Sequence, residues 1–295
     1  MSRVAAYEEV NCRSALNRVQ GMSFSWSLNP YQGCAHGCHY CYARRYHGLR
    51  EQDPHAGFGS KISVKSNIER VLRRELSRPK WRREQVAIGT ATDPYQPLEG
   101  RYRLTQACLR ALHDHKTPVS VVTKGTLVYR DAELLAAMNQ EAGATVVFSL
   151  TTLDKERWAE LEPGTSPPWQ RLRVMQYLRD TGVHVGVLLA PILPGLTDDE
   201  SNLRAVVSAA ADHGAQFLGS QLVYLKQAAK EHFYQYLERK HPSLLAEYRR
   251  LYPNDYAPKR FSRRIQGTVE AIKQDHDLMD QPQPLRPGIR QLSFL

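Results

Sequence analysis

Three cysteines lie close together near the start of the chain. Cys34, Cys38 and Cys41 have the spacing C-x3-C-x2-C within the segment NPYQGCAHGCHYCY, which begins at residue 29. Three thiolates on one short loop can bind three irons of a [4Fe–4S] cluster, because soft sulfur ligands suit iron–sulfur clusters. Gly33 and Gly37 allow the loop to wrap closely around a metal. Because the other cysteines are isolated in the sequence, the spacing predicts a cluster whose fourth iron is open to another ligand.

The same loop allows a second interpretation, a structural zinc ion. Zinc would be bound by the three thiolates together with His36 or His39. Zinc sites usually pair two ligand couples across a longer connecting segment, whereas all these candidates share one loop. Under this alternative the chain would be a non-enzymatic, zinc-dependent nucleic-acid-binding protein.

The elements that position this loop follow an alternating pattern. Short apolar segments, several of them rich in valine, alternate with helical patterns and are predicted strands at residues 23–28, 86–90, 119–123, 145–150, 183–189 and 216–223. Nearly continuous apolar runs are typical of parallel strands that are covered on both faces. Six strands alternating with helices predict βα units, and six units favour a partial (β/α)6 barrel over a closed barrel of eight.

After residue 223 the alternation stops. Residues 226–250 and 259–274 have helical patterns, and the end of the chain is rich in proline and glutamine. We therefore divide the chain into an N-terminal arm at 1–22, the α/β partial barrel with a parallel sheet at 23–225, and a C-terminal helical extension with an extended tail at 226–295.

Composition narrows the class of protein. Forty Lys and Arg against thirty Asp and Glu give a net charge of +10, which is compatible with a polyanionic partner. No apolar run is long enough to cross a bilayer, and the N-terminus lacks the apolar region of a secretory signal. We expect a cytoplasmic protein with no membrane partner, in which clustered cysteines bind metal rather than form disulfides.

The cysteine motif also carries a resemblance to a known family. C-x3-C-x2-C with an aromatic residue before the third cysteine, after the first strand of a six-unit α/β chain, resembles the radical S-adenosylmethionine (SAM) superfamily over roughly residues 23–225. The resemblance implies a [4Fe–4S] cluster whose open iron is chelated by the amino and carboxylate groups of SAM. Reductive cleavage of SAM gives methionine and a 5′-deoxyadenosyl radical, which abstracts a hydrogen atom from a substrate. An electron donor such as flavodoxin or ferredoxin is also implied.

Within this superfamily the chain is similar to the spore photoproduct lyase-like group, whose members are described as resembling DNA-repair photolyases. The run Cys38-His39-Tyr40-Cys41-Tyr42 resembles the cluster loop of the lyase, including both tyrosines. The resemblance implies that Tyr40 packs against the cofactor. It also implies that Tyr42, together with Tyr40, relays a hydrogen atom.

Polar residues follow the next predicted strands, where α/β barrels carry their functional groups. The resemblance implies that these positions bind SAM: Thr90, Thr92, Asp93, Lys124, Ser149 and Pro191. Hydroxyls and a carboxylate suit its ammonium group, Lys124 its carboxylate, and the segment 190–195 its adenine. The alternative for each is a structural role, such as a turn cap or a solvated loop lysine.

One position departs from the lyase pattern. Where the lyase carries a second-strand cysteine as hydrogen donor to the product radical, this chain has Thr90, whose O–H bond is too strong for that role. Either the tyrosines act without a thiol, or the reaction differs from reversal of a thymine dimer.

Three features favour a nucleic-acid substrate. Basic residues surround Trp81 in the segment 70–83 and Phe261 in the segment 259–264, as phosphate tracking with base stacking would require. A solvated helix face is the alternative for both. The terminal residues QLSFL resemble a sliding-clamp-binding peptide with its last two residues exchanged, and a strand packed on its own core is the alternative. The substrate would otherwise be tRNA, a peptide or a small metabolite.

Overall fold

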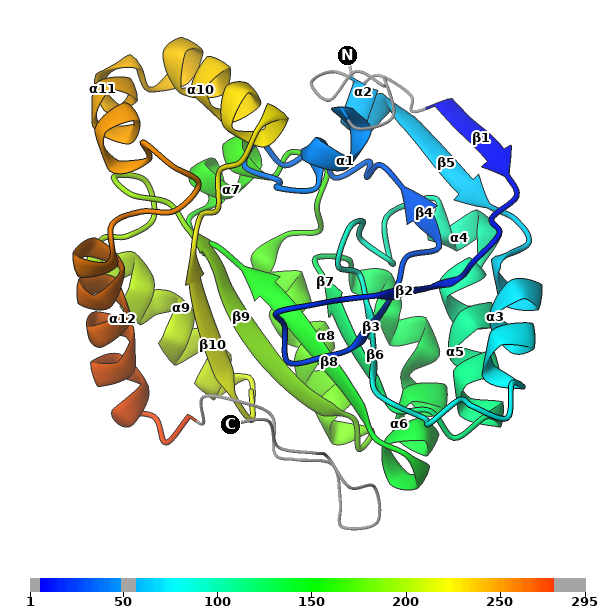
Figure 1. Ribbon diagram of the computed structural model, residues 1–295. Helices are drawn as coiled ribbons and strands as arrows, with labels where there is room; N and C mark the ends of the chain where they lie inside the picture. Colours follow the sequence, from blue (N-terminus) through cyan, green and yellow to red (C-terminus); the bar gives the residue numbers. More distant parts are fainter. Residues whose placement is uncertain (1–5, 49–56, 279–295) are drawn as a thin grey trace.

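Parallel strands form the centre of the protein and follow one another in chain order (Figure 1). The computed structural model describes residues 6–48 and 57–278. The strands are β3 (Trp26–Leu28), β6 (Val86–Ile88), β7 (Val119–Thr123), β8 (Ala144–Leu150), β9 (His184–Ile192) and β10 (Leu218–Leu222). Each pairs in parallel with the next. The α/β fold with a partial (β/α)6 barrel is therefore confirmed.

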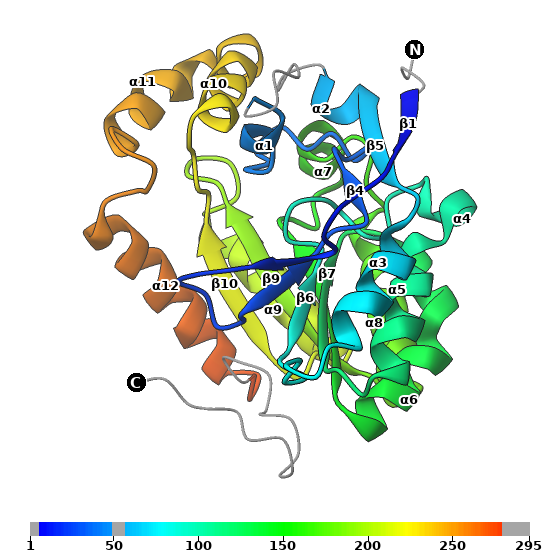
Figure 2. The same cartoon turned by 45° about the vertical axis from the view of Figure 1, so that its right-hand side comes forward.

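Helices return the chain between consecutive strands and cover the sheet. Those following β5 to β9 are α3 (Ile68–Leu76), α4 (Glu99–Tyr102), α5 (Leu104–Asp114), 3-10 helix η1 (Thr126–Asp131), α6 (Ala132–Glu141), α7 (Lys155–Leu161), α8 (Pro168–Asp180) and α9 (Glu200–Asp212). Figure 2 shows α3, α5, α6 and α8 gathered on one side of the sheet. Every residue of β8, whose sequence is ATVVFSL, is buried, as expected for a central strand covered on both faces.

The N-terminal part of the chain contributes strands to two sheets. β2 (Leu16–Arg18) pairs antiparallel with β3 at the edge of the barrel. β1 (Ala6–Val10) and β4 (Tyr31–Gln32) pair with β5 (Lys61–Lys65) in a second, three-stranded sheet. Two of these strands lie in the segment that the sequence analysis treated as an arm. The division of the chain at residues 22 and 225 stays a prediction.

The C-terminal extension consists of α10 (Ala228–Lys240), α11 (Pro242–Leu251) and α12 (Lys259–Gln274). Buried aromatic rings join the first two helices, with Phe233 and Tyr248 at 5.3 Å between centroids. α12 packs against α9 and β10, and α10 packs against α1 (Arg44–Gly48), which follows the cysteines. A short helix, α2 (Gly57–Ser60), precedes β5. The terminal segment 281–295, with its QLSFL peptide, lies outside the described residues.

None of the helices in the described residues combines the length and apolar character that crossing a membrane requires.

Candidate functional site

The three cysteines lie on the segment between β4 and α1, here called the cluster loop (residues 33–43). Figure 1 places this segment over the end of the barrel where the parallel strands finish. Cys34 and Cys38 are buried, Cys41 is half-buried, and all three thiols are free. Gly33 and Gly37 have φ angles of 83° and 62°, in the left-handed region where glycine is favoured. The loop therefore curls so that its thiols are sheltered from solvent.

Side chains that follow β6 hold the start of the cluster loop. The side chain of Gln96, which is fully buried, accepts a hydrogen bond from the backbone N–H of Ala35 at 2.9 Å and donates to the carbonyl of Gly33 at 3.2 Å. The Thr92 hydroxyl donates to the same carbonyl at 2.6 Å. Thr92 thus supports the loop that carries Cys34, a role that its predicted contact with the cofactor did not include.

Two further contacts fix the middle of the loop. The Arg44 guanidinium donates to the carbonyls of Gly37 and Cys38 at 3.2 and 3.1 Å. The backbone N–H of Gly164 donates to the carbonyl of His36 at 3.0 Å, and a Cβ at Gly164 would lie 2.4 Å from a backbone oxygen of the loop. Only glycine allows the segment between α7 and α8 to approach this closely.

Asp93 joins the cluster loop to the end of β7. One of its oxygens accepts from the Thr123 hydroxyl at 2.7 Å, and the other accepts from the backbone N–H of Lys124 at 2.7 Å and lies 3.3 Å from the His36 imidazole. Burial alone would raise the pKa of Asp93, but the imidazole and these donors outweigh it and lower the pKa to about 2. Both oxygens are thus engaged within the protein, and the predicted contact of Asp93 with SAM stays a prediction.

Several predicted site residues converge on the opposite side of the loop. The Lys124 ammonium donates to the Ser149 hydroxyl at 2.5 Å and lies 5.7 Å from the centre of the Tyr40 ring. The Ser149 hydroxyl donates in turn to the carbonyl of Ala190 at 2.7 Å, next to the half-buried Pro191. The ends of β7, β8 and β9 and the cluster loop therefore meet, as expected for parallel strands that finish at one edge.

A buried acid that the sequence analysis missed organises this side. Glu162, at the end of α7, accepts hydrogen bonds from the hydroxyls of Tyr40 and Thr151. It also pairs with the buried Arg171 at 2.5 Å and lies 3.8 Å from the Lys124 ammonium. Burial would raise its pKa, but the two cations and the Tyr40 hydroxyl lower it to about 2. No motif or spacing distinguishes Glu162 from the other acids, because the contact that brings it to the cluster loop is with Tyr40, 122 residues away along the chain.

The second tyrosine of the loop has a different environment. Tyr42 is 40% exposed, and its hydroxyl donates to the backbone carbonyl of Thr90. The Thr90 hydroxyl accepts from the side-chain amide of Asn29 at 3.2 Å. Tyr40 and Tyr42 therefore contact different parts of the open end of the barrel, here called the mouth. Tyr40 lies beside Glu162, and Tyr42 lies at the end of β6.

Both histidines of the loop are engaged by other side chains. The His39 ring stacks on Tyr236 of α10 at 4.5 Å between centroids, and its Nδ1 lies 3.2 Å from Nε2 of His232. Burial, with a contribution from Arg44, lowers the pKa of His39 to about 4. His36 lies against Asp93. Within the part of the chain that is described, no group of three or more His, Cys, Asp or Glu side chains is placed to hold one metal ion.

The donor set fits a [4Fe–4S] cluster better than a single ion. Each thiolate of such a cluster binds a different iron, so the thiols need to surround the cluster rather than converge on one point. Burial, and then the nearby Glu162, raise the pKa of Cys38 to about 12. The positive charge of a bound metal would stabilise the thiolate in such an environment.

The two predicted basic groups lie outside this site. In the first, the indole of Trp81 donates to the Thr117 hydroxyl at 3.1 Å and packs edge-on against Trp26, so this ring is part of the fold. In the second, Phe261 is half-buried at the start of α12, with the Arg264 guanidinium 5.1 Å from its ring. Neither aromatic residue presents a free stacking surface beside the cluster loop.

Comparisons with known proteins agree with this geometry. The model of the radical SAM superfamily matches residues 28–204. An uncharacterised protein of Mycobacterium tuberculosis is 38% identical over 95% of this chain and 84% of its own length. An uncharacterised protein of Methanocaldococcus jannaschii is 25% identical over 89% of this chain and 92% of its own length.

Solved structures of spore photoproduct lyase share the fold. One has a TM-score of 0.65 at 16% sequence identity, covering 92% of this chain and 79% of the lyase. The family match overturns the alternative of a non-enzymatic zinc protein, because members of this family are enzymes that use a [4Fe–4S] cluster and SAM. The family match, the six parallel strands and the three-cysteine loop lead to one conclusion: this chain belongs to the radical SAM superfamily.

Proposed function

We propose that this radical SAM enzyme abstracts a hydrogen atom from a nucleic-acid base, in a lyase reaction of the kind that repairs DNA. The observation that carries the proposal is a row of neighbouring aromatic and guanidinium groups beside the cluster loop, here called the mouth ladder (Tyr46, Arg45, Tyr224 and Tyr256). The Arg45 guanidinium lies 4.7 Å from the centre of the Tyr46 ring and 5.9 Å from that of Tyr224. Tyr224 lies 4.7 Å from Tyr256, which is 63% exposed.

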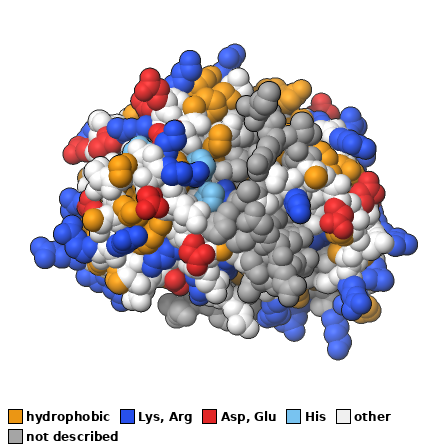
Figure 3. Space-filling view, turned by 90° about the horizontal axis from the view of Figure 1, so that it is seen from above, with side chains coloured by type: hydrophobic (Ala, Val, Ile, Leu, Met, Phe, Trp, Pro, Cys, Tyr) orange, Lys and Arg blue, Asp and Glu red, His pale blue; other side chains and the backbone are white. Residues whose placement is uncertain are grey.

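The position of the ladder suits a base that has left its stack. Arg45 follows Cys41 by four residues, and Tyr224 follows the end of β10 by two, so both belong to the open end of the barrel. Proteins bind unstacked bases on aromatic rings and on guanidinium planes. On the face of the protein seen from above, Lys and Arg side chains are spread around the rim and outnumber the Asp and Glu side chains among them (Figure 3). Positive charge around stacking groups favours a polynucleotide over an uncharged metabolite.

Different residues at the mouth have different roles in this proposal. The cluster is held by Cys34, Cys38 and Cys41. When bound, the cluster and SAM together supply the 5′-deoxyadenosyl radical, after reduction by an electron donor. Lys124, oriented by Ser149 and Glu162, provides a positive charge for the carboxylate of SAM. The buried Glu162 carboxylate, 3.8 Å from the Lys124 ammonium, attracts it and helps to hold it in place.

We assign to Tyr42 the donation of a hydrogen atom to the product radical. Thr90 stands where the lyase has its donor cysteine, and the Tyr42 hydroxyl reaches the backbone of Thr90. A phenolic O–H can donate a hydrogen atom that an aliphatic alcohol holds too strongly. The tyrosyl radical that remains at Tyr42 returns to the phenol by taking one electron from the electron donor and a proton from solvent. The lyase that shares this fold has been solved with a dinucleoside spore photoproduct, and the changed donor favours a different base or lesion for this chain.

The first experiment measures 5′-deoxyadenosine after anaerobic reconstitution with SAM and a reductant. We expect formation in the wild type and none when Cys34, Cys38 and Cys41 are replaced by Ala. The isolated Cys12 is the matched control, and Cys12→Ala retains formation. Absence of 5′-deoxyadenosine from a fully reconstituted wild type contradicts the assigned chemistry.

The second experiment tests the substrate. Single-stranded DNA, duplex DNA and tRNA are added separately, and stimulation of 5′-deoxyadenosine formation is compared. Tyr224→Ala is expected to reduce stimulation by roughly 5- to 100-fold, because base stacking on one aromatic side chain contributes about 1–3 kcal/mol. Tyr177→Ala, at an exposed tyrosine on α8, retains it. Stimulation by tRNA alone selects the alternative substrate, and stimulation by no nucleic acid contradicts the proposal.

A further inference from the structure

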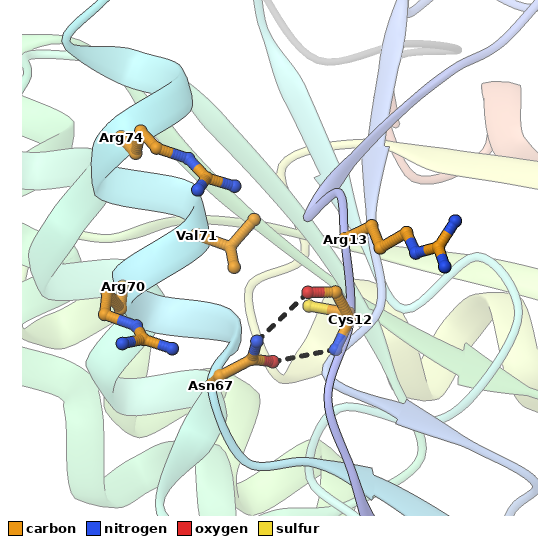
Figure 4. A pocket seen from close by; sticks show the side chains of 6 residues that line it. All are labelled: Cys12, Arg13, Asn67, Arg70, Val71 and Arg74. Carbon is orange, nitrogen blue, oxygen red and sulfur yellow. Dashed lines mark hydrogen bonds between the residues drawn. The ribbon is translucent and has the colours of Figure 1, made fainter.

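We infer that a groove between residues 10–14 and α3 binds phosphates of the nucleic-acid strand whose base enters the mouth, an inference that rests on the proposed function. Figure 4 shows this groove, here called the arginine groove, and the side chains that line it: Cys12, Arg13, Asn67, Arg70, Val71 and Arg74. It encloses a cavity of about 480 Å³. None of these residues belongs to the site described above.

The walls of the groove are held together by hydrogen bonds. The side-chain amide of Asn67 donates to the carbonyl of Cys12 at 3.0 Å and accepts from its backbone N–H at 2.8 Å (Figure 4). Glu75, the residue that follows Arg74, accepts from the backbone N–H of Leu16 at 2.9 Å and from the Ser14 hydroxyl at 2.8 Å. The segment after β1 is thus fixed along α3, which preorganises the groove for a ligand.

The arginines of the groove are available for a ligand. Arg13, Arg70 and Arg74 are exposed, and within residues 6–48 and 57–278 none of the three forms an ion pair. Arg73, on the same helix, instead pairs with Glu69 at 2.9 Å and with Asp114 at 2.7 Å. In the basic segment that begins at residue 70, the charge of Arg73 is therefore neutralised by acids, whereas the charges of Arg70 and Arg74 are not. Unneutralised cations gather on one side of α3.

A second cavity extends from the groove to β4, the strand that immediately precedes the cluster loop. It has a volume of about 540 Å³, shares Cys12 and Arg13 with the first cavity, and continues past Lys65 to Gln32. Gln32 precedes Cys34 by two residues, and its side-chain nitrogen is buried with no hydrogen-bond partner in the described structure. One acid, Glu8, lines this path beside two cations. A strand lying along both cavities would lead from the arginines toward the mouth.

The spacing of the cations fits a phosphate backbone. Arg70 and Arg74 are one helical turn apart, about 6 Å along the axis, which allows each to contact a different phosphate of one strand. A guanidinium group binds phosphate through two parallel hydrogen bonds. Arg13 lies on the segment opposite α3, and its side chain extends away from Arg70 and Arg74 (Figure 4). It also lines the second cavity, so it would contact the strand farther along its path.

The test is binding of a fluorescein-labelled oligothymidylate of about 20 nucleotides to the reconstituted full-length protein, by anisotropy over a range of salt concentrations. Arg70→Gln/Arg74→Gln is expected to lower the slope of log affinity against log salt by about 1.4, because each phosphate of a single strand contributes about 0.7. Arg13→Gln, from the opposite wall, lowers it by about 0.7. The matched control is Arg73→Gln, which removes the same charge from the same helix and keeps the wild-type slope.

Each other outcome overturns the inference in a distinguishable way. If the wild type binds and the groove variants keep its slope, or if Arg73→Gln lowers the slope as much as they do, the groove is not the phosphate site, while the proposed function stands. If the wild type binds no oligonucleotide, both fail. If poly-glutamate of equal charge displaces the oligonucleotide as well as unlabelled DNA does, the groove selects acidic polypeptides instead.

Discussion

Two buried ionic clusters near the open end of the barrel have similar compositions and different surroundings. In the mouth cluster, Glu162 contacts Arg171, Lys124 and the Tyr40 hydroxyl. In the lateral cluster, Arg130 pairs with Glu99 at 2.8 Å and with Asp131 at 3.0 Å, and these acids accept from the hydroxyls of Tyr31 and Tyr95. Each cluster therefore combines carboxylate, guanidinium and tyrosine.

The difference lies in what each cluster connects. The lateral cluster joins β4 to α4 and to the 3-10 helix, and it includes no residue that the sequence or the structure assigns to the site. The mouth cluster includes Tyr40 of the cluster loop and the Lys124 ammonium, whose side chain is 14% exposed. Buried charge alone therefore does not identify a functional site. What distinguishes the mouth cluster is that one of its side chains, Tyr40, belongs to the cluster loop.

The largest effect on stability is expected for Glu162→Gln. Arg171 is fully buried, and without the carboxylate its charge is uncompensated, at a cost of about 3–5 kcal/mol in the free energy of unfolding. Glu99→Gln should cost less, about 1–3 kcal/mol, because Arg130 is partly exposed and keeps Asp131 as a partner. Urea unfolding of both variants measures the difference, and an equal cost would contradict the distinction between the two clusters.

Protonation of Glu162 in the mouth cluster should contribute to unfolding of the protein by acid. The pKa of Glu162 is lowered to about 2 in the folded state, below its unfolded value of about 4.3. Its stabilising contribution is therefore fully present above the unfolded pKa and is lost as the pH falls toward 2. Urea midpoints measured between pH 6 and 2.5 on protein without the cluster should fall less steeply for Glu162→Gln than for Glu99→Gln, and identical profiles would contradict the assignment.

The two substitutions should differ more in their effect on SAM cleavage than in their effect on the free energy of unfolding. Because Glu162 orients Lys124 and Tyr40, Glu162→Gln should reduce the rate of 5′-deoxyadenosine formation by about 10- to 100-fold, the usual effect of losing a residue that orients a ligand-binding group. Its KM for SAM should rise, which a purely structural role would not produce. Glu99→Gln, assayed below its melting temperature, should retain the wild-type rate and KM.

The smallest effect is expected at an exposed pair of similar geometry. Arg157 and Asp199 form an ion pair at 2.9 Å with both side chains more than 40% exposed. Arg157→Ala should change the free energy of unfolding by about 1 kcal/mol or less, because solvent and salt screen such pairs. A loss as large as that of Glu162→Gln would show that burial is not the property that distinguishes the mouth cluster.

The sequence by itself determined the three-cysteine motif and the barrel. The ligand spacing of the cysteines and the alternation of apolar strands with helices are local patterns, and each is complete within a few tens of residues. The convergence of Lys124, Ser149 and Tyr40 also followed from the sequence, because parallel strands in chain order end at one edge. The two strands formed by the predicted arm were missed. The pairing partner of β1 is 55 residues away along the chain, and β2 has only 3 residues, too few for a recognisable pattern.

Only the tertiary structure decided which polar groups support the loop and which cations are free. Gln96, Glu162 and Arg171 have no motif. Gln96 and Glu162 became part of the site through contacts with the cluster loop, which is 61 and 122 residues away along the chain, and Arg171 joins them by pairing with Glu162. Arg70 and Arg73 are equivalent in the sequence, but folding places Arg70 in the lining of the arginine groove and Arg73 beside Asp114. Local spacing specifies which elements form. The partners of a charged side chain depend on how those elements pack, which no local pattern contains.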